Sequence, residues 1–515
     1  MKKCICILLL LVIGLGGCQF LPGTAPEPTN SAGQPITLPV VGSALPQGTN
    51  AANQTAQNLP TFAAIATPGA SPLTPGYYSV VCNDSLSLRS AASTAASKIA
   101  ILFPGEFVKV IDDDGTFAKV EAPGHNKTGY VMRSYLAPAY QPLTSGYKNE
   151  AYANITMQAK CKETLSMRAE PSFSGTTLTI IRRDETVELL GFKELFAKVR
   201  YKNQEGYVQA GYLASADVYP NTIVKITEAY TYEQMQADLL ALQAKYQSTV
   251  KLASAGKSEN GKEIYVLTLG DTQSKKRVLV QASIHAREHM TTLLVMAQAE
   301  YMLAKGLPAG VCFDVFPMLN PDGVQIAQGS YSQGFRNIYD DVKNRNATSA
   351  SMDAYAKLWK ANGKGIDLNR NFDAGFGKGA LINYPASERY AGKAPLDQAE
   401  SKAIAEYVNR YTWHTTLSYH AYGSLIYWNY GNSATNVACW ELGNVIASVT
   451  NYPLTGTADL DAGGFRDWMI EKKGVPSMTI EVGTRDCPLP VEEFYTIWLR
   501  NRNVLYATGE YVLSR

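Results

Sequence analysis

The segment VLVQASIHARE, residues 278–288, places a short apolar run directly before a His-x-x-Glu motif. Its first three residues are branched or long apolar side chains, which predict a short buried strand. Residues 291–305 follow with apolar side chains at helical spacing, and Gly306 marks the expected end of that helix. Ligands of open α/β sheets bind where strands end. The segment therefore predicts an α/β domain with His285 and Glu288 at a ligand site.

Strands alternating with amphipathic helices continue from Tyr219 to Arg515, which is typical of an α/β layer structure. Further apolar or alternating runs predict strands at residues 311–316, 415–419 and 477–482. Residues 320–323, Asn-Pro-Asp-Gly, are typical of a turn. The spacing of apolar residues predicts another helix over residues 396–411.

Two of these strands end in ionisable residues. Alternation in residues 415–420 places Leu417 and Tyr419 on one face and His420 on the opposite, polar face. The same pattern in residues 477–482 separates Glu481 from the apolar set. Three strand ends thus supply two imidazoles and two carboxylates.

These residues form the inventory of a catalytic zinc site, which uses three nitrogen or oxygen ligands and leaves a fourth position to water. The His-x-x-Glu spacing alone is weak evidence, because most histidines are ordinary surface or core residues. We interpret His125, His289 and His414 in that way.

Five short motifs occur in an order that strengthens the zinc interpretation. They are His285-Ala286-Arg287-Glu288, Asn320-Pro321-Asp322-Gly323, Asp367-Leu368-Asn369-Arg370-Asn371-Phe372, Ser418-Tyr419-His420 and Thr479-Ile480-Glu481. Together they resemble the carboxypeptidase A-like zinc peptidases over nearly all of residues 221–515. The resemblance implies a mixed, twisted eight-stranded sheet flanked by helices and one Zn²⁺ held by His285, Glu288 and His420.

The resemblance also implies that Glu481 is the general base. Zn²⁺ lowers the pKa of a bound water toward 7, and a carboxylate beside it can take the proton and pass it to the leaving amine. Asn369 and Arg370 match the family pair that grips the α-carboxylate of the leaving residue, for which a planar guanidinium is suited. Arg287 matches a position used for contacts farther along the substrate. The alternative role for both arginines is a structural salt bridge.

The sequence departs from the family pattern at two positions. Where the animal enzymes place an arginine that polarises the scissile carbonyl, the aligned segment offers Lys360. A lysine can stabilise an oxyanion, but as a single point charge without the guanidinium fork. The mobile lid tyrosine of the family aligns with Asp459, and no tyrosine lies between Tyr452 and Glu481.

The expected substrate follows from residues 463–468, which match the wall of the family's specificity pocket and place Arg466 at its floor. An arginine there favours a leaving residue with a negatively charged side chain. meso-Diaminopimelate fits, because its far end bears a carboxylate and an ammonium that Asp459 or Asp461 could meet. We therefore expect a peptidase resembling the bacterial γ-D-glutamyl-meso-diaminopimelate peptidases, which cut peptidoglycan stem peptides.

The sequence is also compatible with two other functions. One is an exported metallocarboxypeptidase that removes acidic C-terminal residues from ordinary peptides, which Arg466 alone does not exclude. The other is a wall-binding lipoprotein with an inactive peptidase domain. The complete set His285, Glu288, His420 and Glu481 argues against the second.

Residues 77–138 and 155–215 form an internal repeat with an offset of 79 in its first part. Phe117-Ala118-Lys119-Val120 matches Phe196-Ala197-Lys198-Val199, and Gly129-Tyr130-Val131 matches Gly206-Tyr207-Val208. Short alternating strands between Gly and Asp predict two small β-barrels. The pattern resembles the bacterial SH3 family, whose members often bind peptidoglycan. The alternative is that the barrels are spacers or a clamp on the enzyme.

The N-terminus predicts export. Lys2 and Lys3 precede the apolar run 5–15, which is too short to span a bilayer and reads as a signal peptide. Leu15-Gly16-Gly17-Cys18 resembles the lipobox of bacterial lipoproteins, so residues 1–18 predict a lipid on Cys18. The alternative is a plain signal peptide with an incidental cysteine. Residues 19–75 are a predicted linker, and we expect a membrane-anchored lipoprotein on the cell-wall side of a bacterial membrane.

The composition limits which partners and which disulfides can be expected. Lys and Arg total 47 against 45 acidic residues, a net charge of +2, and no long block of one sign predicts a nucleic-acid partner. Five cysteines lie beyond Cys18, at positions 82, 161, 312, 439 and 487. An odd number leaves at least one unpaired, and one or two disulfides are plausible in an exported protein.

Overall fold

The computed structural model describes residues 73–82, 85–103, 106–138, 152, 154–431, 433–456 and 462–515. The predicted signal sequence with Cys18, the linker up to residue 72, and Asp459 and Asp461 lie outside the described residues. Within the described part of the chain, no helix has both the length and the hydropathy needed to cross a membrane.

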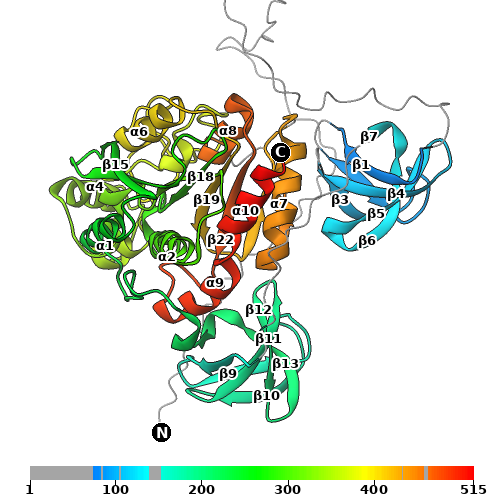
Figure 1. Cartoon of the computed structure of the whole chain (residues 1–515), viewed down its shortest axis with the longest axis horizontal. Coiled ribbons are helices and arrows are strands. Elements are labelled where there is room, and N and C mark those ends of the chain that lie inside the picture. The colour runs from blue at the N-terminus through cyan, green and yellow to red at the C-terminus, as the bar shows by residue number, and fades with distance from the viewer. Residues whose placement is uncertain are drawn as a thin grey trace, which may run out of the picture. The chain divides into compact units, whose positions relative to one another are not determined.

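Each predicted repeat folds into a small β-barrel of seven strands, and the two barrels share one strand order (Figure 1). The first, drawn in blue to cyan, contains β1 (Gly76–Val80), β2 (Leu86–Arg89), β3 (Lys98–Leu102), β4 (Phe107–Asp113), β5 (Phe117–Ala122), β6 (Lys127–Met132) and β7 (Leu136–Pro138). The second contains β8 (Thr156–Ala159), β9 (Thr164–Arg168), β10 (Thr177–Arg182), β11 (Thr186–Lys193), β12 (Phe196–Tyr201), β13 (Gln204–Gln209) and β14 (Leu213–Ala214). Alternate residues of each strand fill the barrel core, as the repeat pattern predicts.

The C-terminal domain is built on a mixed eight-stranded sheet, in the order β15-β16-β18-β17-β19-β22-β20-β21. The strands are β15 (Val250–Lys257), β16 (Glu263–Gly270), β17 (Arg277–Ala282), β18 (Cys312–Phe316), β19 (Thr415–Ala421), β20 (Leu425–Tyr427), β21 (Leu454–Thr455) and β22 (Ser477–Val482). The central strands β18, β17, β19 and β22 are parallel, while β15, β16 and β20 pair antiparallel with their inner neighbours. This confirms the expected sheet.

Helices cover both faces of this sheet. They are α1 (Tyr232–Lys245), α2 (Met290–Lys305), α3 (Pro321–Ala327), α4 (Gln333–Asn344), α5 (Met352–Lys357), α6 (Ala399–Val408), α7 (Asn436–Thr450), α8 (Phe465–Lys473), α9 (Phe494–Asn501) and α10 (Val504–Leu513). Figure 1 shows α1 and α2 on one side of the sheet and α6 on the other. The larger core takes Leu417 and Tyr419 of β19, and the smaller one takes Leu279 of β17.

The face of β19 that carries its polar residues is buried, as is its apolar face. All seven residues of this strand are buried, so Thr416, Ser418 and His420 do not face open solvent. Thr416 instead bonds Ser477 across the strands, with their hydroxyl oxygens 2.6 Å apart. Parallel central strands are normally covered on both sides. His420 is therefore a buried residue at the end of a buried strand.

Two local predictions were wrong. The segment predicted as a turn at residues 320–323 begins helix α3, because the Asn320 side chain accepts a bond from the Gly323 N–H and Pro321 occupies the first helical position. The helix predicted from residue 396 begins only at Ala399, since Leu396 has a left-handed backbone conformation with φ of 57°. In contrast, α2 ends at Gly306 with φ of 99°, as expected.

The structure also does not form the disulfides considered plausible from composition. Cys161, Cys312, Cys439 and Cys487 are buried free thiols. Burial raises the pKa of the Cys312 and Cys439 thiols to about 12. A thiol that stays protonated is a poor nucleophile, so these cysteines are core side chains.

The second barrel contacts the loop that follows β22. The Gln209 side chain donates to the Thr484 carbonyl at 2.8 Å, and the Gly211 N–H donates to the Thr484 hydroxyl at 3.0 Å. Leu499 of α9 is buried in the core of this barrel. The loop held in this way begins directly after the strand that carries Glu481.

Candidate active site

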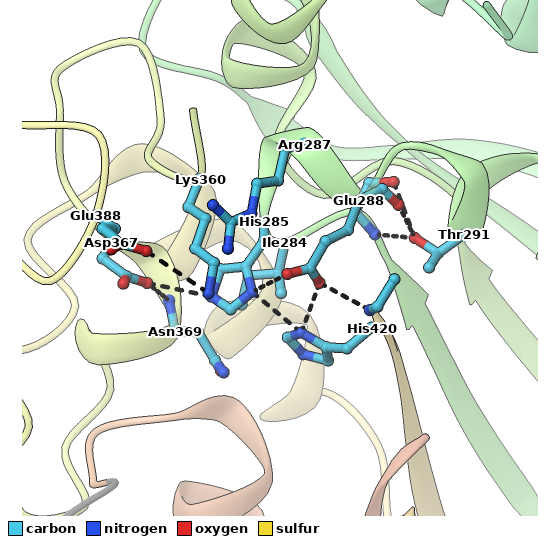
Figure 2. A network of polar contacts seen from close by, with 12 residues as sticks. Ile284, His285, Arg287, Glu288, Thr291, Lys360, Asp367, Asn369, Glu388 and His420 are labelled. Carbon is cyan, nitrogen blue, oxygen red and sulfur yellow. Dashed lines mark hydrogen bonds and ion pairs between the residues drawn. The ribbon is translucent and has the colours of Figure 1, made fainter. Parts of the chain in front are cut away.

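His285, Glu288 and His420 come together at the carboxyl ends of β17 and β19 (Figure 2). The His285 Nδ1 atom lies 2.9 Å from Glu288 Oε1, and the His420 Nδ1 atom lies 3.0 Å from Glu288 Oε2. The two Nδ1 atoms are 3.2 Å apart. The Ala421 N–H donates to Glu288 Oε2 at 3.1 Å and helps to orient the carboxylate. Three donor atoms therefore converge on one point.

The ionised carboxylate of Glu288 favours a cation at the point where the three side chains meet. Burial pushes the pKa of Glu288 upward, but His285 and His420 hold it well below its usual range. Burial lowers the pKa of His420, which keeps its imidazole neutral near pH 7. Burial also opposes the charge on His285, yet Glu288 and Asp367 raise its pKa to about 9. An ionised carboxylate between two imidazoles is the donor set that divalent zinc binds.

The spacing of the donors also fits zinc. Nitrogen and oxygen ligands lie about 2.0 to 2.2 Å from zinc, so two ligands of a tetrahedral site are roughly 3.3 to 3.6 Å apart. The observed separations of 2.9, 3.0 and 3.2 Å are close to this range and need only a small outward movement. Among the described residues this is the one cluster of His, Cys, Asp or Glu with such geometry.

Asp367 supports the His285 ring from the other side. Its Oδ1 lies 3.3 Å from His285 Nε2, and it also accepts the Asn369 N–H. Burial alone would raise the pKa of Asp367, but His285, Arg370 and Lys360 hold it well below its ordinary value. A carboxylate behind a metal-binding histidine fixes the ring orientation and makes the ligand more basic. Sequence reasoning quoted Asp367 within a motif but gave it no role.

Glu481 lies beside this cluster at the end of β22. His420 and Glu481 are partners in the parallel pairing of β19 with β22, so their side chains project from the same face of the sheet. Glu481 lines the same cavity as the three candidate ligands. The cavity, of about 220 Å³, therefore places a carboxylate next to the metal position.

Asn369 and Arg370 line the cavity from the short 3₁₀ helix Leu368–Arg370. The Asn369 carbonyl oxygen Oδ1 accepts the Phe465 N–H at 3.1 Å, which fixes the orientation of the side-chain amide. Its Nδ2 group bonds to no residue in the described part of the chain and remains available as a donor. A guanidinium and an amide N–H₂ side by side can hold a carboxylate.

Arg466 lines the same cavity from the first turn of α8, but it is buried and already has an anionic partner. Its Nη2 and Nε atoms donate to Asp467 Oδ1 at 2.6 and 3.0 Å. Asp467 also accepts the Gly464 N–H and lines the cavity. The floor of the predicted specificity pocket is therefore a pair of opposite charges rather than a lone cation.

Arg287 and Lys360 border the cavity on the side of the 3₁₀ helix Ala286–Glu288. The Arg287 N–H donates to the Trp359 carbonyl at 2.8 Å, which holds the two segments together. The Lys360 Nζ atom lies 3.8 Å from Glu388, a loose ion pair at the surface. In Figure 2, Arg287 and Lys360 lie on one side of the His285 ring and Asn369 on the other.

Tyr422, Tyr427 and Thr479 also line the cavity, and sequence reasoning missed all three. Tyr422 lies two residues after His420, and a hydrogen bond with Asp486 raises its pKa. It is 48% exposed, so it forms part of the cavity mouth. Proximity to His420 along the strand was a usable signal for Tyr422, while Tyr427 reaches the site only through the pairing of β20 with β22.

The fold and the site define a class: an α/β domain with a His-Glu-His metal site at strand ends and a carboxylate beside it. A comparison with known families agrees. Residues 235–504 match the zinc carboxypeptidase family, and residues 84–137 and 163–214 match the bacterial SH3 domain. The chain belongs to the zinc carboxypeptidase family and is a metallopeptidase with two bacterial SH3 repeats.

Individual relatives agree with this family. The chain is 30% identical to gamma-D-glutamyl-L-diamino acid endopeptidase 1 of Lysinibacillus sphaericus over 299 residues, which covers 54% of this chain and 71% of the relative. It is 28% identical to carboxypeptidase A1 of Bos taurus over 218 residues, which covers 40% of this chain and 48% of the relative.

Proposed function

We propose that this protein is a zinc peptidase that hydrolyses the γ-D-glutamyl-meso-diaminopimelate bond of peptidoglycan stem peptides. The observation that carries the proposal is the number of basic side chains around the metal cluster: Arg287, Lys360, Arg370 and Arg466 line one cavity. A stem peptide of this kind presents three carboxylates near the scissile bond. The similarity to an endopeptidase named for γ-D-glutamyl-L-diamino acid bonds supports the same substrate class.

Each residue of the site has a role in this reaction. His285, Glu288 and His420 would hold the zinc, and Asp367 orients His285. Bound zinc supplies a Lewis acid and makes water a nucleophile at neutral pH. Glu481 accepts the proton of the attacking water and returns it to the leaving amine. Lys360 donates to the carbonyl oxygen as negative charge develops there.

Asn369 and Arg370 hold the α-carboxylate of the leaving diaminopimelate. Arg466 and Asp467 face its far end, which carries a carboxylate and an ammonium. A buried pair of opposite charges matches this zwitterion, with the guanidinium meeting the carboxylate and Asp467 meeting the ammonium. Asp467 thus provides the acidic group for the ammonium, a role that the sequence had suggested for Asp459 or Asp461.

We also propose that the two repeats hold the enzyme at the cell wall and that a lipid on Cys18 anchors it to a bacterial membrane. The match of both repeats to the bacterial SH3 domain supports the first part. The lipobox-like segment before Cys18 supports the second.

Mass spectrometry of reaction products tests the substrate. The purified protein is incubated with L-Ala-γ-D-Glu-meso-diaminopimelate and, separately, with an α-linked peptide ending in L-Glu. We expect L-Ala-D-Glu and free diaminopimelate from the first and little product from the second. The opposite preference would assign the protein to carboxypeptidases of acidic peptides.

A tripeptide with L-Lys in place of diaminopimelate tests Arg466. Hydrogen bonds to charged groups are worth roughly one to two powers of ten in the specificity constant, so the lysine substrate should be used about 10- to 100-fold less well. Arg466→Leu should reduce that preference. Equal use of both tripeptides by the wild-type enzyme would show that Arg466 does not read the substrate.

A further inference from the structure

Arg287 carries a positive charge that no carboxylate neutralises within the described part of the chain. Its side chain makes one polar contact to a described residue, from Nη1 to the Leu358 carbonyl at 3.4 Å, which is longer than a normal N–H···O bond of 2.7 to about 3.2 Å. Its Nε atom is shielded from solvent and has no acceptor among the described residues. By contrast, Arg466 in the same cavity bonds Asp467 at 2.6 Å.

Lys360 adds a second positive charge on the same side of the cavity. The Ala286 N–H donates to the Lys360 carbonyl at 3.1 Å, so the segments that carry Arg287 and Lys360 are hydrogen-bonded to each other. Lys360 pairs only loosely with Glu388, whose side chain is 39% exposed. Exposed pairs of this kind are screened by water and contribute little. This side of the cavity is therefore complementary to an anion.

The anion has to lie on the acyl side of the scissile bond. Asn369 and Arg370 serve the carboxylate of the leaving residue, and Figure 2 shows Arg287 across the His285 ring from Asn369. An ordinary α-linked peptide has no obligatory carboxylate on its acyl side. A γ-linked glutamyl residue does, because its α-carboxylate is free. This carboxylate is separated from the scissile carbonyl by the α-carbon and two methylene groups.

We propose that Arg287 binds the free α-carboxylate of the γ-linked glutamyl residue and so selects γ-linked over α-linked substrates. The inference rests on the proposed function. A guanidinium binds a carboxylate through two parallel N–H···O bonds, and Lys360 beside it raises the positive potential that attracts the anion. Recognition of the acyl residue is then separate from recognition of the leaving residue by Asn369, Arg370 and Arg466.

Two γ-linked tripeptides test the inference, L-Ala-γ-D-Glu-meso-diaminopimelate and its analogue in which the glutamyl α-carboxylate is a carboxamide. Wild type should use the carboxylate about 10- to 100-fold better, judged by kcat/KM. Arg287→Gln should remove most of this preference by slowing the carboxylate substrate and leave the carboxamide substrate within about threefold. Arg345→Gln, which alters an exposed arginine paired with Asp341, is the control and should keep the preference.

A binding measurement gives a second readout that does not depend on turnover. Calorimetry on the Glu481→Gln protein should show tighter binding of L-Ala-D-Glu than of L-Ala-D-isoglutamine, and the added Arg287→Gln change should abolish the difference. Equal use of both γ-linked tripeptides by wild type, or an equal loss on both in Arg287→Gln, overturns the inference and leaves the proposed function standing. Cleavage of the α-linked isomer with no cleavage of either γ-linked tripeptide overturns the proposed function and the inference together.

Discussion

At the scale of single residues, His420 and Glu481 lie at the same register of two neighbouring parallel strands. This pairing places a carboxylate beside a candidate metal ligand without any loop between them. We predict that Glu481→Gln keeps the fold and the zinc but lowers turnover by about 10²- to 10⁴-fold, because an amide is a poor proton acceptor. Steady-state kinetics and metal content on the same preparation provide the check.

The matched control for this variant is Glu471→Gln, which alters an exposed glutamate of α8 paired with Lys472. It should retain wild-type turnover. Activity of Glu481→Gln within about tenfold of wild type, at normal zinc content, would mean that another group accepts the proton.

His285, His420 and Glu481 could be placed at one site from the sequence because each lies at or just after the end of a strand that its own sequence pattern predicts. His285, His420 and Glu481 each follow an alternating or apolar run. Asp367 was not given a role, since its contact with His285 joins two segments far apart in the chain. The Arg466–Asp467 pair was also missed. The sequence does not reveal whether the arginine pairs with a substrate or with a neighbouring carboxylate, because that depends on local geometry.

At the scale of elements, the segment between α5 and α6 carries Lys360, Asp367, Asn369 and Arg370 with little regular structure. Asn362 holds it in place: its Oδ1 accepts the N–H groups of Lys364 and Ile366, and its Nδ2 donates to Gln398 and Glu400. Glu400 lies in the first turn of α6 and is fully buried. This anchor links the cavity-lining segment to a helix of the smaller core.

Burial raises the pKa of Glu400 from 4.5 to about 7, although bonds from Asn362 and Glu259 partly oppose the rise. The folded chain thus binds this proton more tightly than the unfolded chain. The corresponding stability is fully present below pH 4.5 and is lost as the pH rises through about 7. The size of this contribution is on the order of 3 kcal/mol.

Glu400→Gln removes this titration, because glutamine keeps an acceptor oxygen but does not ionise. We predict that the melting temperature of the variant, relative to wild type, is higher at pH 8 than at pH 5. Glu406→Gln, an exposed site on the same helix, is the control and should follow wild type at both values. Parallel pH profiles for wild type and Glu400→Gln would show that Glu400 stays in one charge state.

Element prediction succeeded where a single periodicity governs the whole segment. Strand β22 and helix α2 lie within one residue of their expected bounds. It failed at residues 320–323 and at residue 396, where one side chain decides the outcome. Asn320 caps a helix instead of closing a turn, and the Asp397 carboxylate accepts the N–H groups of Lys393 and Ala394 before α6 can begin.

At the scale of the whole molecule, the second barrel packs against helix α9 of the peptidase domain. Arg500 of α9 is buried and donates to the Glu194 carbonyl of the barrel at 2.6 Å and to the Thr450 and Asn451 carbonyls of its own domain. Leu499 fills the barrel core from the same helix. The repeat was recognisable in the sequence, but this contact was not, because the apolar pattern of neither segment predicts which other segment it packs against.

Removal of residues 77–215 tests both roles of the repeats. We predict that the shortened chain still hydrolyses small γ-linked tripeptides, sediments less with isolated sacculi, and melts at a lower temperature because Leu499 and Arg500 lose their partners. Sedimentation and thermal melting of both proteins measure the two effects. Equal sedimentation would assign the repeats to the spacer role, and equal melting would show that the barrel does not support the peptidase.

We infer that His285, Glu288 and His420 hold one zinc ion on which hydrolysis depends. The most direct measurement is the zinc content of the purified protein by elemental analysis, taken together with activity before and after chelation. We predict about one zinc per active chain, loss of activity on chelation and its return on adding zinc. His420→Ala should lose both the metal and the activity, while His414→Ala, outside the site, should keep both. An active preparation without stoichiometric zinc would show that hydrolysis does not depend on a metal held by these three residues.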